Sequence, residues 1–200
     1  MGKLSKTLKN VAQNLSAQST VLLKNVGDLL PLQPNAKVAV IGLADANSTI
    51  YGGTGSGSVI PSFGLTPLDA VSAFAKAHGG SVSFTPIVAP GTAAGTEEEA
   101  AAWMAPAVAA AKDADVAVVF VGTTSGEGKD RESLGLGAVA ACATCEQDLL
   151  VAAIAKAQPK TAVSIVSPVR CGGNTPLLCT TFVQHRSFCH DRLGTNTRKR

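Results

Sequence analysis

The feature that most constrains the fold is a run of six consecutive apolar residues, 116–121, that leads into a polar segment rich in glycine. A strand that is apolar at successive positions has no side suited to water, so both of its faces must be covered. Related runs occur at 38–41 and 161–166, and segments with helical periodicity separate the three. The sequence therefore predicts an α/β fold, with a mainly parallel sheet covered by helices on both faces.

The hydrophobic pattern also predicts the individual elements. We expect helices over about 3–17, 66–77, 97–112 and 146–157, and strands over 21–23, 38–41, 82–84, 116–121 and 161–166, the last strand of the chain. Two helix starts carry N-cap residues, Thr66 before Pro67 and Thr96 before three glutamates. His78, next to Gly79, is expected to cap a helix end rather than to take part in catalysis.

The composition fits one folded domain without a nucleic-acid or membrane partner. The chain has 200 residues, 46% of them hydrophobic, which is enough for one sizeable core. A net charge of +3 is too small to indicate nucleic-acid binding, and no apolar run reaches the roughly 20 residues that cross a bilayer. The polar segment 1–9 is not followed by the apolar stretch of a secretion signal, so the sequence leaves localisation open.

The last part of the chain differs from the rest. Residues 169–200 contain three cysteines and two histidines, end in Thr-Arg-Lys-Arg, and show no apolar periodicity. We therefore expect a domain over 1–168, followed by a disordered tail over 169–200 that is not homologous to it. On this view the α/β fold is incomplete at its C-terminal end, which would leave a strand edge open.

The loop that follows the apolar strand carries the candidate chemistry. In open α/β sheets, ligands bind at the carboxyl ends of the strands, and here the loop brings Glu127, Asp130 and Arg131 to that edge. Glycines at 122, 126 and 128 permit turns that a Cβ would hinder. The alternative interpretation is a solvated turn with a few charges.

Neither glycine-rich loop has the pattern of a nucleotide site. Residues 53–57 are not G-x-G-x-x-G, and they begin about ten residues after the strand ends rather than at its tip. The later loop fails as a P-loop because Thr123 replaces a required glycine and Asp130 replaces the Ser or Thr that binds Mg²⁺. A flavodoxin-like nucleotide-binding domain stays as an alternative from another functional class.

Five motifs, taken in order, resemble the second, C-terminal domain of glycoside hydrolase family 3, the β-glucosidase and β-xylosidase type. They are Ser-Thr-Val-Leu-Leu-Lys-Asn at 19–25, a strand at 37–42, the glycine-rich loop at 51–59, Thr-Pro-Leu-Asp-Ala at 66–70 and Ser-Gly-Glu-Gly-Lys-Asp-Arg at 125–131. The resemblance covers about residues 8 to 167. It implies a three-layer α/β/α sandwich.

The resemblance implies retaining hydrolysis of β-linked glucosides or related oligosaccharides, in which two carboxyl groups about 5–5.5 Å apart flank the glycosidic bond. In this family the nucleophile is an Asp on a preceding (β/α)₈ barrel, and in many members the acid/base is a Glu of the second domain. Glu127 matches that Glu. The positions that the resemblance assigns to substrate binding are Gly53, Gly55, Ser56, Asp130 and Arg131.

We expect the sequence to supply, at most, half of such an active site. The Ser-Asp-Trp signature of the nucleophile is absent, and the only tryptophan, Trp103, lies in a predicted helix. We therefore expect a carbohydrate substrate and a barrel domain as partners, no cofactor, and no activity in the chain alone. The alternative is a non-catalytic module that binds a glycan or a protein partner through the same loops.

The cysteine pattern leaves several interpretations open. Cys142 and Cys145 form a C-x-x-C, which suits a redox pair, half of a zinc site, a local disulfide or two free thiols. A zinc site needs two further ligands, and the cysteines and histidines of 169–200 are irregularly spaced. We therefore expect no metal site.

Overall fold

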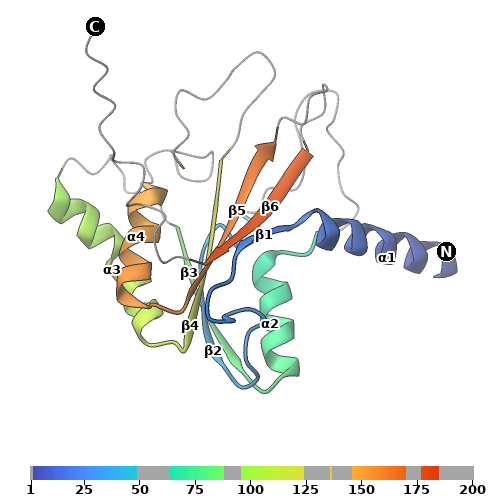
Figure 1. Ribbon diagram of the computed structural model, residues 1–200, viewed down its shortest axis with the longest axis horizontal. Helices are drawn as coiled ribbons and strands as arrows, with labels where there is room; N and C mark the ends of the chain where they lie inside the picture. The colour runs from blue at the N-terminus through green and yellow to red at the C-terminus, as the bar shows by residue number, and fades with distance from the viewer. Residues whose placement is uncertain are drawn as a thin grey trace, which may run out of the picture.

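The structure is a computed structural model that describes residues 2–48, 64–87, 96–123, 136, 146–169 and 177–184. Its helices are α1 (Gly2–Ser19), α2 (Pro67–Ala77), α3 (Glu97–Lys112) and α4 (Gln147–Ala157). Its strands are β1 (Val21–Lys24), β2 (Lys37–Gly42), β3 (Ser81–Pro86), β4 (Val116–Gly122), β5 (Thr161–Val169) and β6 (Leu177–Gln184). Figure 1 shows these elements around one sheet.

The sheet is mainly parallel, as the sequence predicts. Its strand order is β1-β6-β5-β4-β2-β3, and the four strands β3, β2, β4 and β5 are parallel to one another. β6 pairs with β5 in the antiparallel sense and with β1 in the parallel sense. The four parallel strands therefore have their carboxyl ends at one edge of the sheet.

Helices cover the parallel strands on both faces, which confirms the three-layer α/β/α sandwich. α3 and α4 lie on one face and α2 lies on the other (Figure 1). Successive residues of β2 and β4 alternate between the two cores, as the strand period of two requires. Ile41 and Val119 pack towards α3 and α4, whereas Val40 and Val118 pack on the side of α2.

Both predicted N-caps are confirmed. The Oγ1 of Thr66 accepts a hydrogen bond from the backbone N–H of Asp69 (3.0 Å), and the Oγ1 of Thr96 accepts one from that of Glu99 (3.2 Å). In each case the acidic side chain also accepts a hydrogen bond from the backbone N–H of the cap residue, which completes a capping box.

The prediction that 161–166 is the last strand is wrong. Residues 177–184 form β6, which lies in the sheet between β1 and β5. The missed signal is local, since 180–183 reads Thr-Thr-Phe-Val, a run of β-branched and aromatic residues that favours a strand. Residues 170–176 and 185–200 lie outside the described residues, and a separate origin for 169–200 stays a prediction.

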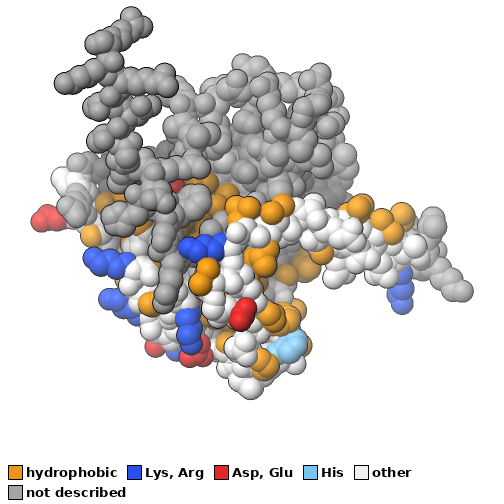
Figure 2. Space-filling model, in the orientation of Figure 1, with side chains coloured by type: hydrophobic (Ala, Val, Ile, Leu, Met, Phe, Trp, Pro, Cys, Tyr) orange, Lys and Arg blue, Asp and Glu red, His pale blue; other side chains and the backbone are white. Residues whose placement is uncertain are grey.

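Helix α1 forms as predicted, but its apolar side chains are exposed. It extends away from the sheet in Figure 1, and its hydrophobic atoms lie at the surface in Figure 2. Leu8, Val11 and Leu15 share one side of the helix at spacings of three and four residues, and all three are exposed. Within the described ranges, every helix is too short or too polar to cross a membrane.

Candidate functional site

The two glycine-rich loops leave the sheet at the same edge. β2 and β4 are parallel neighbours, with Gly42 opposite Phe120, and each is followed by one of the loops. We call the ends of β2 and β4, at Gly42 and Gly122, the stems of the two loops. The stems are joined by a hydrogen bond from the N–H of Leu43 to the carbonyl oxygen of Phe120 (2.8 Å). The fold therefore starts both loops side by side at the carboxyl ends of the parallel strands, where such sheets bind ligands.

Glycine is required at both stems. Gly42 has a φ of +101°, and a Cβ there would collide with the carbonyl oxygen of Phe120. A Cβ on Gly122 would lie 2.8 Å from the carbonyl oxygen of Val166. The two glycines thus allow neighbouring strands to stay close at the edge where they end.

The first loop is closed at its base by α2. The backbone N–H of Leu68, in the first turn of α2, donates to the carbonyl oxygen of Ala44 (3.0 Å) just after β2. Between β2 and the loop, Asp45 accepts a hydrogen bond from the N–H of Ser48 through Oδ1 (3.0 Å). Both ends of the segment that contains residues 51–59 are therefore fixed to the sheet edge.

The second loop is closed at its base by α4. The side chain of Gln147 is completely buried, and its Oε1 accepts a hydrogen bond from the N–H of Gly122 (3.0 Å). Its Nε2 donates to the carbonyl oxygens of Gly122 (2.8 Å) and Leu136 (3.4 Å). The N–H of Leu136 donates to Oδ2 of Asp148 (3.0 Å).

An apolar cavity of about 220 Å³ lies at the same edge of the sheet, between β3 and α3. Thr85, Pro86 and Ile87 contribute its wall at the end of β3, and Trp103 and Pro106 contribute the wall from α3. A cavity with this lining suits an apolar group better than the hydroxyl groups of a sugar.

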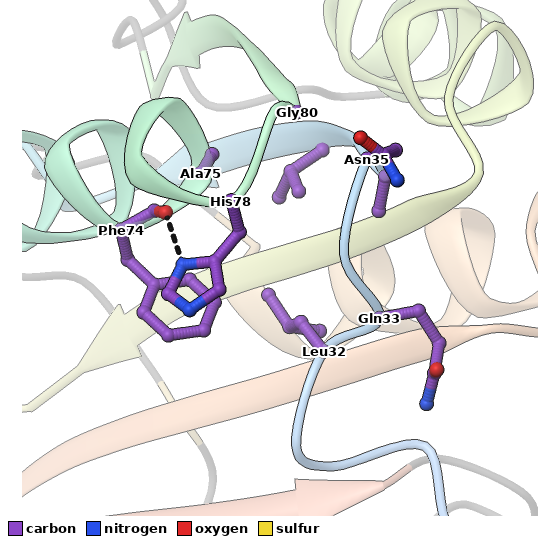
Figure 3. A pocket seen from close by; sticks show the side chains of 9 residues that line it. Leu32, Gln33, Asn35, Phe74, Ala75, His78 and Gly80 are labelled. Carbon is purple, nitrogen blue, oxygen red and sulfur yellow. Dashed lines mark hydrogen bonds between the residues drawn. The ribbon is translucent and has the colours of Figure 1, made fainter.

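At the opposite edge of the sheet lies a small hollow of about 10 Å³, which is room for about one water molecule. Figure 3 shows His78 at its rim, where the ring stacks on Phe74 at 4.2 Å between centroids. The Nδ1 of His78 lies 2.8 Å from the carbonyl oxygen of Phe74, near the end of α2. This confirms the predicted capping role.

The family described as glycosyl hydrolase family 3 C-terminal domain matches residues 20–171. The chain belongs to this family. No curated protein matches the sequence. Three solved β-glucosidases are similar to the chain in structure, and in each case the similarity covers most of this chain.

The β-glucosidase D2-BGL from Chaetomella raphigera has a TM-score of 0.59 and 26% identity, over 79% of this chain and 23% of its own. A family 3 β-glucosidase from Bifidobacterium adolescentis has a TM-score of 0.54 and 30% identity, over 82% of this chain and 22% of its own. A β-glucosidase from Erythrobacter marinus has a TM-score of 0.59 and 25% identity, over 87% of this chain and 26% of its own. The chain thus spans about a quarter of the length of these similar enzymes.

The site residues that the sequence predicts for this family 3 domain lie outside the described residues. They are Glu127, Gly53, Gly55, Ser56, Asp130 and Arg131. What the structure brings together is the pair of stems from which their loops start, at β2 and β4. Among the described residues there is no cluster of three potential metal ligands, and Cys142 and Cys145 are outside them.

Gln147 was not identified from the sequence. It lies on the buried side of α4 with Leu150, Val151 and Ile154, at spacings of three, four and seven residues. A polar side chain on an apolar helix face is the signal that could have identified it, because a buried amide requires hydrogen-bond partners.

Proposed function

We propose that this chain supplies one half of the active site of a retaining β-glucosidase-like enzyme. In this proposal Glu127 is the general acid/base, and the glycine-rich loop with Gly53, Gly55 and Ser56 lines the sugar site. The nucleophile comes from a (β/α)₈ barrel domain. The substrate class is β-linked glucosides or related oligosaccharides.

One observation carries the proposal: the two loops that resemble the acid/base and sugar-site loops of family 3 leave adjacent parallel strands at one edge of the sheet. A general acid has to lie within hydrogen-bond reach of the leaving oxygen while the sugar is held in place. Loops that start side by side can meet this requirement together. The three similar solved structures, all of them β-glucosidases, support the same substrate class.

The proposed mechanism has two steps. In the first, the barrel Asp attacks the anomeric carbon while Glu127 protonates the leaving oxygen, which gives a glycosyl-enzyme. In the second, Glu127 as a carboxylate removes a proton from water, which attacks the anomeric carbon and releases the sugar. Arg131 and Asp130 are proposed to hold and orient the loop, since Arg–carboxylate pairs commonly fix loop geometry.

The test compares the 200-residue chain alone with the same chain joined behind a family 3 barrel. We expect no turnover of nitrophenyl glucoside or xyloside by the chain alone, because a general acid without a nucleophile contributes only about 10²–10⁴-fold. The joined protein should turn over the glucoside. Turnover by the purified chain alone that Glu127→Gln abolishes would overturn the proposed division of the active site.

A further inference from the structure

Gln147 connects the two ends of the segment that contains Glu127. Three hydrogen bonds of its side-chain amide join it to Gly122, the last residue of β4, and to Leu136. The Nε2 atom donates to both carbonyl oxygens, so both of its N–H groups are used. These three bonds are called the Gln147 bridge below. The bridge brings residues 122 and 136 to the same side-chain amide.

Strand geometry explains why the bridge exists. Peptide groups along a strand point alternately to its two sides: the carbonyl of Phe120 accepts from Leu43 on the β2 side, and the N–H of Thr123 donates to Val166 on the β5 side. Gly122 therefore turns its N–H and C=O towards β2, which has already ended at Gly42. Gln147 supplies the acceptor and the donor that a longer β2 would have provided.

The orientation of the amide is fixed by its partners. Oε1 faces an N–H, and Nε2 faces two carbonyl oxygens. A rotated amide would place Oε1 against both carbonyl oxygens and lose all three bonds. The two bonds to Gly122 are also shielded from water, because Gln147 is completely buried. Hydrogen bonds in such an environment hold their geometry more firmly than solvated ones.

We propose that Gln147 is a positioning residue for Glu127. It fixes the direction in which the chain leaves β4 and the point to which it returns, and so limits where the carboxyl group of Glu127 can lie. A catalytic group displaced by about 1 Å can cost about a hundredfold in rate. This inference rests on the proposed role of Glu127 as the acid/base.

A matched pair of variants separates positioning from stability. Gln147→Met keeps the length of the side chain and removes the bridge. Gln158→Met makes the same change near the other end of α4, where Nε2 of Gln158 donates to the carbonyl oxygens of Ala111 (3.2 Å) and Ala114 (2.7 Å). Both variants lose amide-to-backbone bonds, but only the first affects the segment between 122 and 136.

The first measurement uses the full chain joined to a family 3 barrel. For a β-glucoside with a poor leaving group, such as methoxyphenol, we expect Gln147→Met to lower kcat/KM by about tenfold or more, because protonation of the leaving oxygen limits the rate. For dinitrophenyl β-glucoside, whose leaving group needs no proton, the loss should stay within about twofold. Gln158→Met should leave the ratio of the two rates unchanged.

The second measurement uses the 200-residue chain itself. We expect the amide hydrogens of Gly122 and Leu136 to exchange with solvent about tenfold faster in Gln147→Met and at the original rate in Gln158→Met, because opening of the loop base then needs less free energy. Asp148 has an exposed side chain, and Asp148→Ala removes only the hydrogen bond that its Oδ2 accepts from the N–H of Leu136. It should accelerate exchange at Leu136 alone, which keeps the test valid if Gln147→Met does not fold.

Failure of the inference and failure of the proposed function look different. If Gln147→Met slows both glucosides equally while Glu127→Ala slows only the one with the poor leaving group, Gln147 is merely structural and the inference is wrong. If Glu127→Ala shows no dependence on the leaving group, the proposed function is wrong and the inference falls with it. Unchanged exchange at Gly122 and Leu136 in Gln147→Met also overturns the inference.

Discussion

Strands β1 and β2 are both short apolar segments followed by turns, yet they lie in different environments. In β2, Val38 to Ile41 are at most 1% exposed, whereas Val21 to Leu23 in β1 are 48–61% exposed. β2 lies between β3 and β4 and is covered by helices on both faces. Among the strands that the structure describes, β1 lies at the edge of the sheet and pairs with β6 alone. Burial therefore depends on what covers a segment, not on its residue types alone.

The same contrast separates two larger parts of the molecule. We call β2, β3, β4 and β5 with α2, α3 and α4 the inner unit, and α1, β1 and β6 the outer unit. The inner unit contains both buried cores and both loop stems. The outer unit presents apolar side chains of α1 and β1 to solvent (Figure 2). The two loops of the candidate site thus start from the inner unit, whose strands and helices are packed against one another.

The largest difference in the free energy of unfolding is expected between two leucine-to-alanine substitutions, one in each unit. Leu150→Ala in α4 and Leu15→Ala in α1 remove the same atoms, but the first residue is 2% exposed and the second 63% exposed. Leu150→Ala should lower the free energy of unfolding by about 2–5 kcal/mol because it leaves a cavity. Leu15→Ala should change it by less than about 0.5 kcal/mol. Urea unfolding followed by circular dichroism measures both, and equal losses would break the comparison.

A smaller effect is expected from alanine at two glycines with positive φ. Gly27, in the turn after β1, has a φ of +73° and open space around it, whereas a Cβ on Gly42 would meet the carbonyl oxygen of Phe120. Gly27→Ala should cost about 1 kcal/mol from backbone strain alone. Gly42→Ala should cost about 2–3 kcal/mol, because β4 or β2 has to shift as well. Thermal unfolding of the two variants measures both costs, and a cost at Gly27 as large as at Gly42 would contradict the effect expected from the space around the two glycines.

The smallest expected difference is in the free energy of local unfolding of helices α1 and α4. Lys9 in α1 and Lys156 in α4 are both exposed helical lysines, but only α4 packs on a core. Trypsin should cleave after Lys9 about tenfold faster than after Lys156, which corresponds to a difference of about 1.4 kcal/mol in opening free energy. Mass spectrometry of a short digestion gives the order of cleavage. Cleavage after Lys156 first would reverse the proposed ranking of the two units.

Most of the inner unit could be predicted from the sequence, because its signals are local. The apolar run 116–121 determines β4, and Thr66 and Thr96 mark the starts of α2 and α3 through hydrogen bonds within one turn. Local signals also sufficed for the capping role of His78, since its partner is four residues away.

The features that the sequence analysis missed depend on distant partners. The run 180–183 favours a strand locally, but the place of β6 in the sheet comes from its pairing with β1 and β5, which the local sequence does not specify. Gln147 acts on Gly122, 25 residues earlier, and its role follows only from where β2 ends. The side chains predicted for catalysis and sugar binding belong to residues outside the described ranges, so the role of Glu127 stays a prediction.

The central claim is that Glu127 is the acid/base of a family 3 active site, and the most direct measurement compares it with Glu132, the next glutamate along the chain. The 200-residue chain joined to a family 3 barrel would carry Glu127→Ala or Glu132→Ala. We expect Glu127→Ala to lower kcat/KM about 10²–10⁴-fold for poor leaving groups and far less for activated ones. Added azide should restore turnover of the activated substrate in Glu127→Ala by attacking the glycosyl-enzyme. If Glu132→Ala shows this pattern and Glu127→Ala does not, the claim is wrong.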